Sequence, residues 1–132
     1  MKLREIGTIV RLQIQRSSLK VGLRPYRVYD PSPLLNVEQL SVSPDGAIAL
    51  LPEGRTMIDV HHRRHPDSQN AGDNGVSIGF TSNYARMRER YGEHIADGYA
   101  GENILIETAE SFTQSDLERG MAIRCGAADA DL

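Results

Sequence analysis

A chain of 132 residues fits one domain with a single hydrophobic core, and we expect that core to be modest and aliphatic because only 39% of residues are apolar and none is Trp. A formal net charge of −3 gives no support for general electrostatic binding to nucleic acid, which needs a basic surface. The single cysteine, Cys125, cannot form an internal disulfide. No apolar run reaches the roughly 20 residues of a membrane span, and the first residues lack the apolar segment of a signal peptide. We therefore expect a soluble cytoplasmic protein.

The segment from Ile6 to Gln15 carries the clearest strand pattern. Five of its side chains alternate with the others and should share one face: Ile6, Thr8, Val10, Leu12 and Ile14. Three polar side chains should share the opposite face: Arg11, Gln13 and Gln15. This period of two predicts a half-buried strand.

A hairpin and several short strands follow. Pro44 and Gly46 suit the second and fourth positions of a type I turn, which predicts a hairpin between the apolar runs on either side. The other short strands are expected at Val28–Tyr29, Met57–Val60, Val76–Phe80, Asn103–Glu107 and Met121–Arg124.

One helix is predicted, over about residues 82–91. Thr81 or Ser82 can cap its start and Gly92 can end it. Three side chains at helical spacing should form one face: Tyr84, Met87 and Tyr91. Arg86 and Arg90 lie along a different face, which should be solvated or ligand-facing.

These elements predict a mainly β, barrel-like fold with one well-defined helix and short strands. We expect a single domain over residues 1–125. Residues 126–132, with the sequence Gly-Ala-Ala-Asp-Ala-Asp-Leu, show no pattern and are expected to form a disordered tail.

Charged and imidazole groups gather between Asp59 and Pro66, at the end of a predicted strand, where binding residues often lie. Three histidines with two nearby carboxylates suggest a zinc site: His61, His62, His65, Asp59 and Asp67. Pro66, however, favours an extended conformation at the residue before it, so the spacing matches no strong zinc signature. Solvated or hydrogen-bonded structural histidines are the alternative interpretation.

Arg63 and Arg64 suggest an anion site in the same segment. Guanidinium groups bind phosphate in a fork geometry, and the turn at Gly72–Gly75 would add backbone N–H donors, although Asp73 would oppose an anion. A charged surface loop explains the same residues equally well.

The segment Gly98–Asn103 precedes a strand rather than opening a helix, so it is not a dinucleotide-binding or P-loop glycine pattern. Gly101 allows a close backbone approach, while Glu102 and Asn103 offer an acceptor and an amide for a ligand. A tight loop whose Asn bonds the backbone is the structural alternative.

Taken in order, these motifs resemble the MOSC domain, the family named for the C-terminal domain of molybdenum cofactor sulfurases. The similar features are the strand at Gly7–Val10, Asp59-x-His61 after a strand, the Asn74-Gly75 turn, the helix with Tyr84 and Gly92, and Gly98-x-x-Gly101-Glu102-Asn103. The resemblance extends from roughly Gly7 to Arg124, and the last motif is the most specific.

The resemblance implies a barrel-like fold that binds molybdenum cofactor (molybdopterin) or a related phosphate-bearing pterin, in sulfur transfer or molybdenum-dependent reduction. The family is also linked to pyridoxal phosphate enzymes, because its founding members are fused to a cysteine desulfurase-like domain, which does not fit in this chain. The cofactor-binding residues it implies are Asp59, His61, Arg63, Arg64, Asn74, Gly101, Glu102 and Asn103. The arginines would hold phosphate and the others would orient the ring or the metal.

Two features depart from the family pattern. The family's cysteine, which ligates molybdenum or carries sulfur, usually lies further along the chain than Cys125, so we do not assign that role to Cys125. The more usual glycine-rich stretch is replaced by His62, Arg63, Arg64 and His65.

A non-catalytic binding or interaction domain of the same fold is therefore the alternative function, and a small zinc-binding protein is a third. A barrel without its last strands would leave an open edge for a partner protein or for self-association, unless it closes with fewer strands. A shortened member of the family is the other interpretation.

Overall fold

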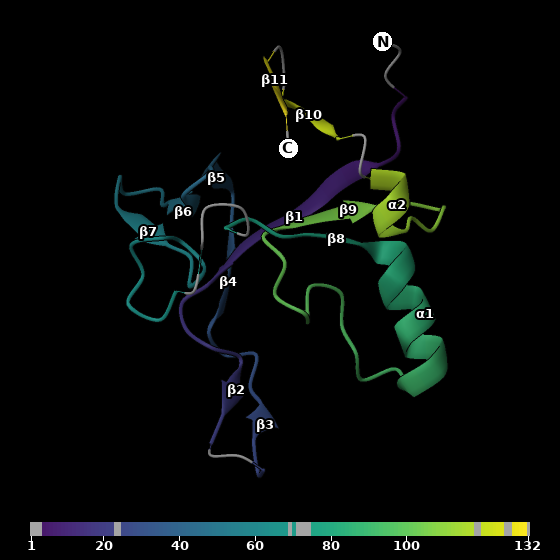
Figure 1. The fold of residues 1–132 in the computed structure, drawn as a ribbon, viewed down its shortest axis with the longest axis horizontal. Coiled ribbons are helices and arrows are strands. Elements are labelled where there is room, and N and C mark those ends of the chain that lie inside the picture. The colour runs from purple at the N-terminus through teal and green to yellow at the C-terminus, as the bar shows by residue number, and fades with distance from the viewer. Residues whose placement is uncertain are drawn as a thin grey trace.

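The computed structural model describes residues 4–22, 25–68, 70, 75–117, 120–125 and 128–131. Its centre is a four-stranded sheet with the strand order β4-β1-β9-β8 (Figure 1). β1 pairs antiparallel with both β4 and β9, and β8 pairs parallel with β9. The bounds of these strands are Thr8–Gln15 for β1, Leu34–Val37 for β4, Ile78–Phe80 for β8 and Ile104–Glu107 for β9.

Three smaller antiparallel sheets surround this centre. The bounds of their strands are Lys20–Val21 (β2) with Val28–Tyr29 (β3), Gln39–Ser43 (β5) with Gly46–Leu50 (β6) and Thr56–Ile58 (β7), and Ala122–Cys125 (β10) with Ala128–Asp131 (β11). The mainly β fold with one main helix is therefore confirmed. The strands in the described part of the chain form separate sheets and not a closed barrel.

A β-bulge in β1 overturns the predicted faces of this strand. The register with β9 shifts between Ile9 and Arg11, so the simple alternation does not continue across the strand. As a result Val10 is 50% exposed, whereas Ile9 packs against the core beside Leu12. Gln13 and Gln15, expected on the polar face, are buried, because β1 is an inner strand that is covered on this face too.

The core lies on the central sheet, at β8 and β9, and the helix α1 (Thr81–Tyr91) follows β8 directly. Phe80, Ile104 and Ile106 form the buried cluster, and α1 lies beside β8 and β9, across the central sheet from β5–β7 (Figure 1). Burial of these aliphatic and aromatic side chains is the main favourable term for the fold.

The sequence predicts the C-terminal end of α1 correctly but not the cap at its N-terminal end. Gly92 ends the helix as expected, with φ of 116° and its N–H donated to the carbonyl of Arg88 at 2.9 Å. The predicted cap is wrong: the residue before the helix is Phe80, and no side chain caps it. Thr81 Oγ1 instead accepts the N–H of Thr108 at 3.1 Å, which ties α1 to the end of β9.

Tyr84 is buried on the inner face of α1, as predicted, but Tyr91 is 61% exposed. Tyr91 is the last helical residue, and the guanidinium of Arg90 lies 5.4 Å from the centre of its ring. The shared face expected for these two tyrosines therefore does not extend to the end of the helix.

The predicted hairpin at Pro44–Gly46 is confirmed, since Ser43 pairs with Gly46 across the turn. Four elements lie outside the sequence prediction: β2, β4, β11 and a short helix α2 (Gln114–Leu117). Pro31 and Pro33 lie directly before β4, and prolines argue against a strand when only the sequence pattern is considered.

At the C-terminal end, Ala128–Asp131 pairs with β10, so these four residues differ from the expected disordered tail. Backbone hydrogen bonds form this pairing, and the alanine-aspartate pattern gives no side-chain signal for it. Gly126, Ala127 and Leu132 lie outside the described residues. Within the described ranges, no helix is long and apolar enough to cross a membrane.

Candidate functional site

Asp59 follows β7 directly and is the centre of the candidate site. Its side chain is fully buried. Oδ1 accepts the N–H of Gln15 at 2.7 Å and the side-chain amide of Asn103 at 3.1 Å. Oδ2 accepts the N–H of His61 at 2.9 Å and lies 3.0 Å from His61 Nδ1. These contacts fix the carboxylate from both sides, as a buried charge requires.

The contact between Asp59 and His61 favours the charged form of both side chains. Burial raises the pKa of Asp59, but hydrogen bonds from the His61 side chain and from backbone N–H groups outweigh it and leave the pKa below its usual value. The hydrogen bond to Asp59 raises the pKa of His61, against the smaller effect of burial. The His61 side chain is 47% exposed, and no described residue bonds its Nε2. The site can therefore hold a proton on an accessible imidazole.

The other two histidines of this segment are structural. His62 is buried, and its Nδ1 accepts the N–H of Arg64 at 3.1 Å. His65 Nδ1 accepts the N–H of Asp67 at 3.1 Å, so its Nε2 carries the proton that is donated to the Arg16 carbonyl at 3.0 Å. Among the residues that the structure describes, no three His, Cys, Asp or Glu side chains are placed to hold a metal ion. The zinc hypothesis therefore has no support in these residues.

Arg63 and Arg64 are exposed on the turn that follows His61. Arg63 Nη1 lies 3.5 Å from Asp45 Oδ1, but both side chains are more than half exposed, so this pair is weak. Both guanidinium groups are thus accessible to an anion that approaches the turn.

Asn103 and Glu102, predicted to contact a ligand, are instead buried in the scaffold. Asn103 Oδ1 accepts the N–H of Ser77 at 3.1 Å, and its Nδ2 donates to the carbonyl of Gln13 as well as to Asp59. The Glu102 carboxylate accepts the hydroxyl of Tyr84, which lies 2.6 and 2.8 Å from its two oxygens. Their polar groups therefore position other residues.

Gly101 has φ of 85°, a conformation that favours glycine. A Cβ on Gly101 would lie 2.3 Å from Gln15 Nε2, which donates to the Gly101 carbonyl at 3.1 Å. Gln15 thus contacts Gly101 through its side chain and Asp59 through its backbone.

The structure therefore brings together only part of the predicted set. Asp59 contacts His61 and Asn103 directly, and Gly101 through Gln15. Glu102 is bound to Tyr84 instead, and Asn74 lies outside the described residues. Gln13 and Gln15 were not predicted, because alternating amides on a strand look like a solvent-facing row.

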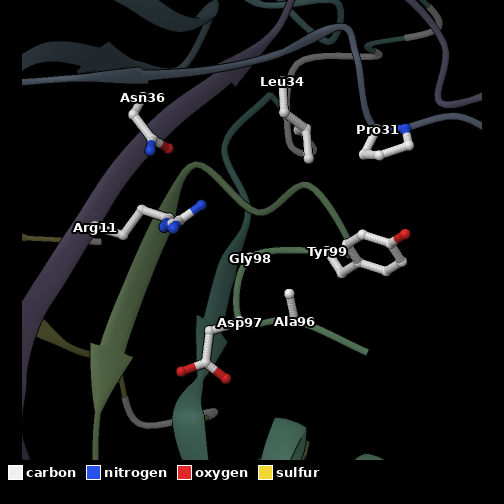
Figure 2. Close-up of a pocket in the computed structure, with 8 residues that line it drawn as sticks. All are labelled: Arg11, Pro31, Leu34, Asn36, Ala96, Asp97, Gly98 and Tyr99. Carbon is white, nitrogen blue, oxygen red and sulfur yellow. The ribbon is translucent and has the colours of Figure 1, made fainter. Parts of the chain in front are cut away.

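Two open clefts are each lined by one member of a pair of tyrosines. Tyr29 and Tyr99 have ring centroids 4.6 Å apart and an interplanar angle of 35°. One cleft, of about 330 Å³, is lined by Gln15, Ser18, Leu19, Lys20, Tyr29 and Ala100. Since Gln15 also holds Asp59, this cleft is linked to the Asp59–His61 pair through one residue. The other cleft, lined partly by Tyr99, is shown in Figure 2.

Comparison of the chain with protein-family models, with curated proteins and with solved structures finds no match in any of the three. The interpretation of function therefore depends on the order of the sequence motifs and on the geometry around Asp59. The resemblance to the MOSC domain accordingly stays a prediction.

Proposed function

We propose that this chain is a MOSC-like domain that binds molybdenum cofactor, or a related phosphate-bearing pterin, at the turn beside Asp59. The observation that carries this proposal is the pairing of a fully buried carboxylate with a half-exposed imidazole at 3.0 Å. A buried, fourfold hydrogen-bonded Asp that orients one exposed His is a costly arrangement for a surface loop, and it is typical of a binding site.

The donor set fits the phosphate end of such a ligand. Arg63 and Arg64 are exposed and adjacent to His61, and guanidinium groups bind phosphate oxygens in pairs. The raised pKa of His61 favours a third positive charge on the same turn. When bound, the cofactor would supply redox chemistry at molybdenum.

The residues of the chain then divide into two roles. Arg63 and Arg64 bind the phosphate, and His61 orients the ligand and holds a proton at Nε2. Asp59, Asn103 and Gly101 keep the turn in place. Glu102 is assigned to the same supporting role, through Tyr84.

The barrel-like closure suggested by the family resemblance is part of the same proposal. β4 and β8 are the edge strands of the central sheet. An edge strand exposes unpaired backbone groups, to which a second copy of the chain or a partner protein would add strands. Self-association that rises with concentration in sedimentation experiments supports this closure, and a monomer at all concentrations contradicts it.

A non-catalytic binding domain of the same fold is the second candidate, because the buried contacts of Glu102 and Asn103 leave few polar groups for chemistry. It predicts ligand binding without turnover. Turnover of an N-hydroxylated substrate that is abolished by His61→Gln would reject it.

The cofactor proposal is tested by elemental analysis of protein purified from a host that makes molybdenum cofactor. We expect near-stoichiometric molybdenum in the natural chain and its loss in the double variant Arg63→Ala with Arg64→Ala. The double variant Arg86→Ala with Arg90→Ala removes the same charge from exposed positions of α1 and should keep its molybdenum. Equal molybdenum in both double variants, or none in the natural chain, contradicts the proposed site.

A further inference from the structure

A second open cleft lies apart from the turn at Asp59. It is bounded by β1, β4 and the loop before β9 (Figure 2), and its volume of about 270 Å³ is close to the roughly 300 Å³ at which small-molecule sites begin. Its lining is divided by polarity. Arg11 and Asn36 lie on one side, and the apolar surface comes from Pro31, Leu34 and Tyr99.

Arg11 contributes a positive charge that the protein does not neutralise. Its side chain is half-buried and points from β1 into the cleft, yet it forms no hydrogen bond or ion pair with any described residue. Asp97 also lines the cleft, but its carboxylate is paired with Arg88 at 2.7 Å. The Asp97 carboxylate is thus already paired, which leaves the positive charge of Arg11 for a ligand.

Gly98 keeps the space beside the Arg11 guanidinium open. Its φ is 86°, and a Cβ at this position would lie 3.0 Å from Arg11 Nη1 and 3.1 Å from Arg11 Cδ. A larger residue at this position would therefore strain the backbone and require the Arg11 side chain to shift. The absence of a side chain here lets Arg11 lie against the backbone at the base of the cleft.

Tyr99 forms an aromatic wall that is held in place. Its ring packs against Tyr29 with a centroid distance of 4.6 Å. Leu34 and Pro31 continue this apolar side (Figure 2). A flat apolar group placed here would contact the ring by stacking or by its edge.

We propose that this cleft binds a small aromatic carboxylate. Arg11 pairs with the carboxylate, the Asn36 amide donates a further hydrogen bond to it, and Tyr99 and Leu34 contact the aromatic ring. A planar carboxylate matches the guanidinium fork, and its single negative charge matches the one free positive charge of the cleft. No residue of the turn at Asp59 lines this cleft, so the proposal is independent of cofactor binding.

The test is a titration of the full chain with 2-naphthoate, followed by amide NMR shifts. We expect the largest shifts at Asn36 and at residues 96–99. The neutral amide, 2-naphthamide, should bind at least about tenfold more weakly, because a charge-assisted hydrogen bond is lost. Arg11→Gln should weaken 2-naphthoate binding by a similar factor, whereas Arg86→Gln, on the exposed face of α1, should leave it unchanged.

Other results overturn the proposal. Equal binding of 2-naphthamide removes the role of the carboxylate, and displacement of 2-naphthoate by inorganic phosphate shows a general anion site. Shifts confined to other parts of the chain place the ligand elsewhere. If Arg11→Gln does not fold, Arg11→Lys and Asn36→Ala replace it, and unchanged affinity in both contradicts the assignment.

Discussion

A single hydrogen bond of 3.1 Å joins the side chains of Asp59 and Asn103, which are 44 residues apart in the sequence. It connects the turn after β7 to the loop before β9. Asn103 also donates to the Gln13 carbonyl, so β1 belongs to the same network. Asp59, which orients His61, is therefore part of a network that joins three segments: the turn after β7, the loop before β9, and β1.

We predict that Asp59→Asn destabilises the protein by about 2 to 3 kcal/mol, because an amide cannot accept hydrogen bonds from all the donors that surround this buried carboxylate. Urea unfolding at neutral pH measures the effect. Asp67→Asn, at an exposed position, is the control and should change stability by less than about 0.5 kcal/mol. Similar stability of both variants would show that the network contributes little.

The raised pKa of His61 predicts a specific pH dependence of stability. The folded state binds the proton more tightly than the unfolded state, so the contribution is complete below the unfolded pKa of about 6.5 and is lost as the pH rises through the folded pKa. The lowered pKa of Asp59 has the opposite effect: its contribution is present above about pH 3.9 and is lost as the pH falls through the folded pKa.

Urea midpoints from about pH 5.5 to about pH 8.5 test the prediction for His61, since this window spans the ordinary histidine pKa. The stability difference between the natural chain and His61→Gln should shrink as the pH rises. His94→Gln removes an exposed histidine elsewhere and is the control. A difference that stays constant with pH would mean that Asp59 does not favour the protonated imidazole.

Gly101→Ala should disrupt the contact with Gln15. Gly101 and Gly54 have nearly the same φ, 85° and 86°, but a Cβ on Gly101 meets Gln15 at 2.3 Å, while one on Gly54 meets nothing within 4 Å. Gly54→Ala therefore measures the cost of the conformation alone, about 1 kcal/mol. We expect Gly101→Ala to cost more by at least about 1 kcal/mol, since overpacking adds to that strain. Equal midpoints in urea would show that Gln15 can move away freely.

Tyr84→Phe should lower the stability of the folded protein more than most conservative substitutions. The hydroxyl donates to Glu102 and accepts the N–H of Ala100 at 2.8 Å, and the side chain is buried. Its removal leaves a buried carboxylate without this donor, at a cost of about 2 to 3 kcal/mol. Tyr91→Phe, at an exposed tyrosine, should be neutral in the same thermal or urea unfolding experiment.

The same hydroxyl offers a spectroscopic test. Burial, followed by the hydrogen bond to Glu102, raises the pKa of Tyr84 far above that of a free phenol. In an alkaline titration monitored by ultraviolet absorbance, Tyr84 should ionise only when the protein unfolds. Ionisation of all tyrosines in the folded state would contradict the buried contact with Glu102.

Local signals in the sequence predict the parts of the fold that local chemistry determines. The Pro44–Gly46 turn and the end of α1 at Gly92 depend on the conformations of a few adjacent residues, and both are confirmed. The buried side chain of Gln13 donates to the Gly98 carbonyl, 85 residues away, and the strand contains a bulge that no local residue type marks. A period-two pattern therefore predicted the strand but not its faces.

The candidate site divides in the same way. Asp59 and His61 are two residues apart, so their pairing follows from the local turn. Glu102 and Asn103 were predicted as ligand contacts because their side chains are polar, but the residues that bind them come from distant elements. Exposure, which distinguishes a binding residue from a supporting one, is set by tertiary packing and is not visible in the residue type.

Three alternate residues of β1 contact three different parts of the molecule. Arg11 lines the cleft beside Tyr99, Gln13 donates to the Gly98 carbonyl, and Gln15 holds both Gly101 and Asp59. Residues two apart on a strand lie roughly 6 to 7 Å from each other, so one element fixes the spacing among these contacts. An insertion or deletion within this stretch would misplace all of them together, and this short strand should therefore tolerate substitutions far better than changes in length.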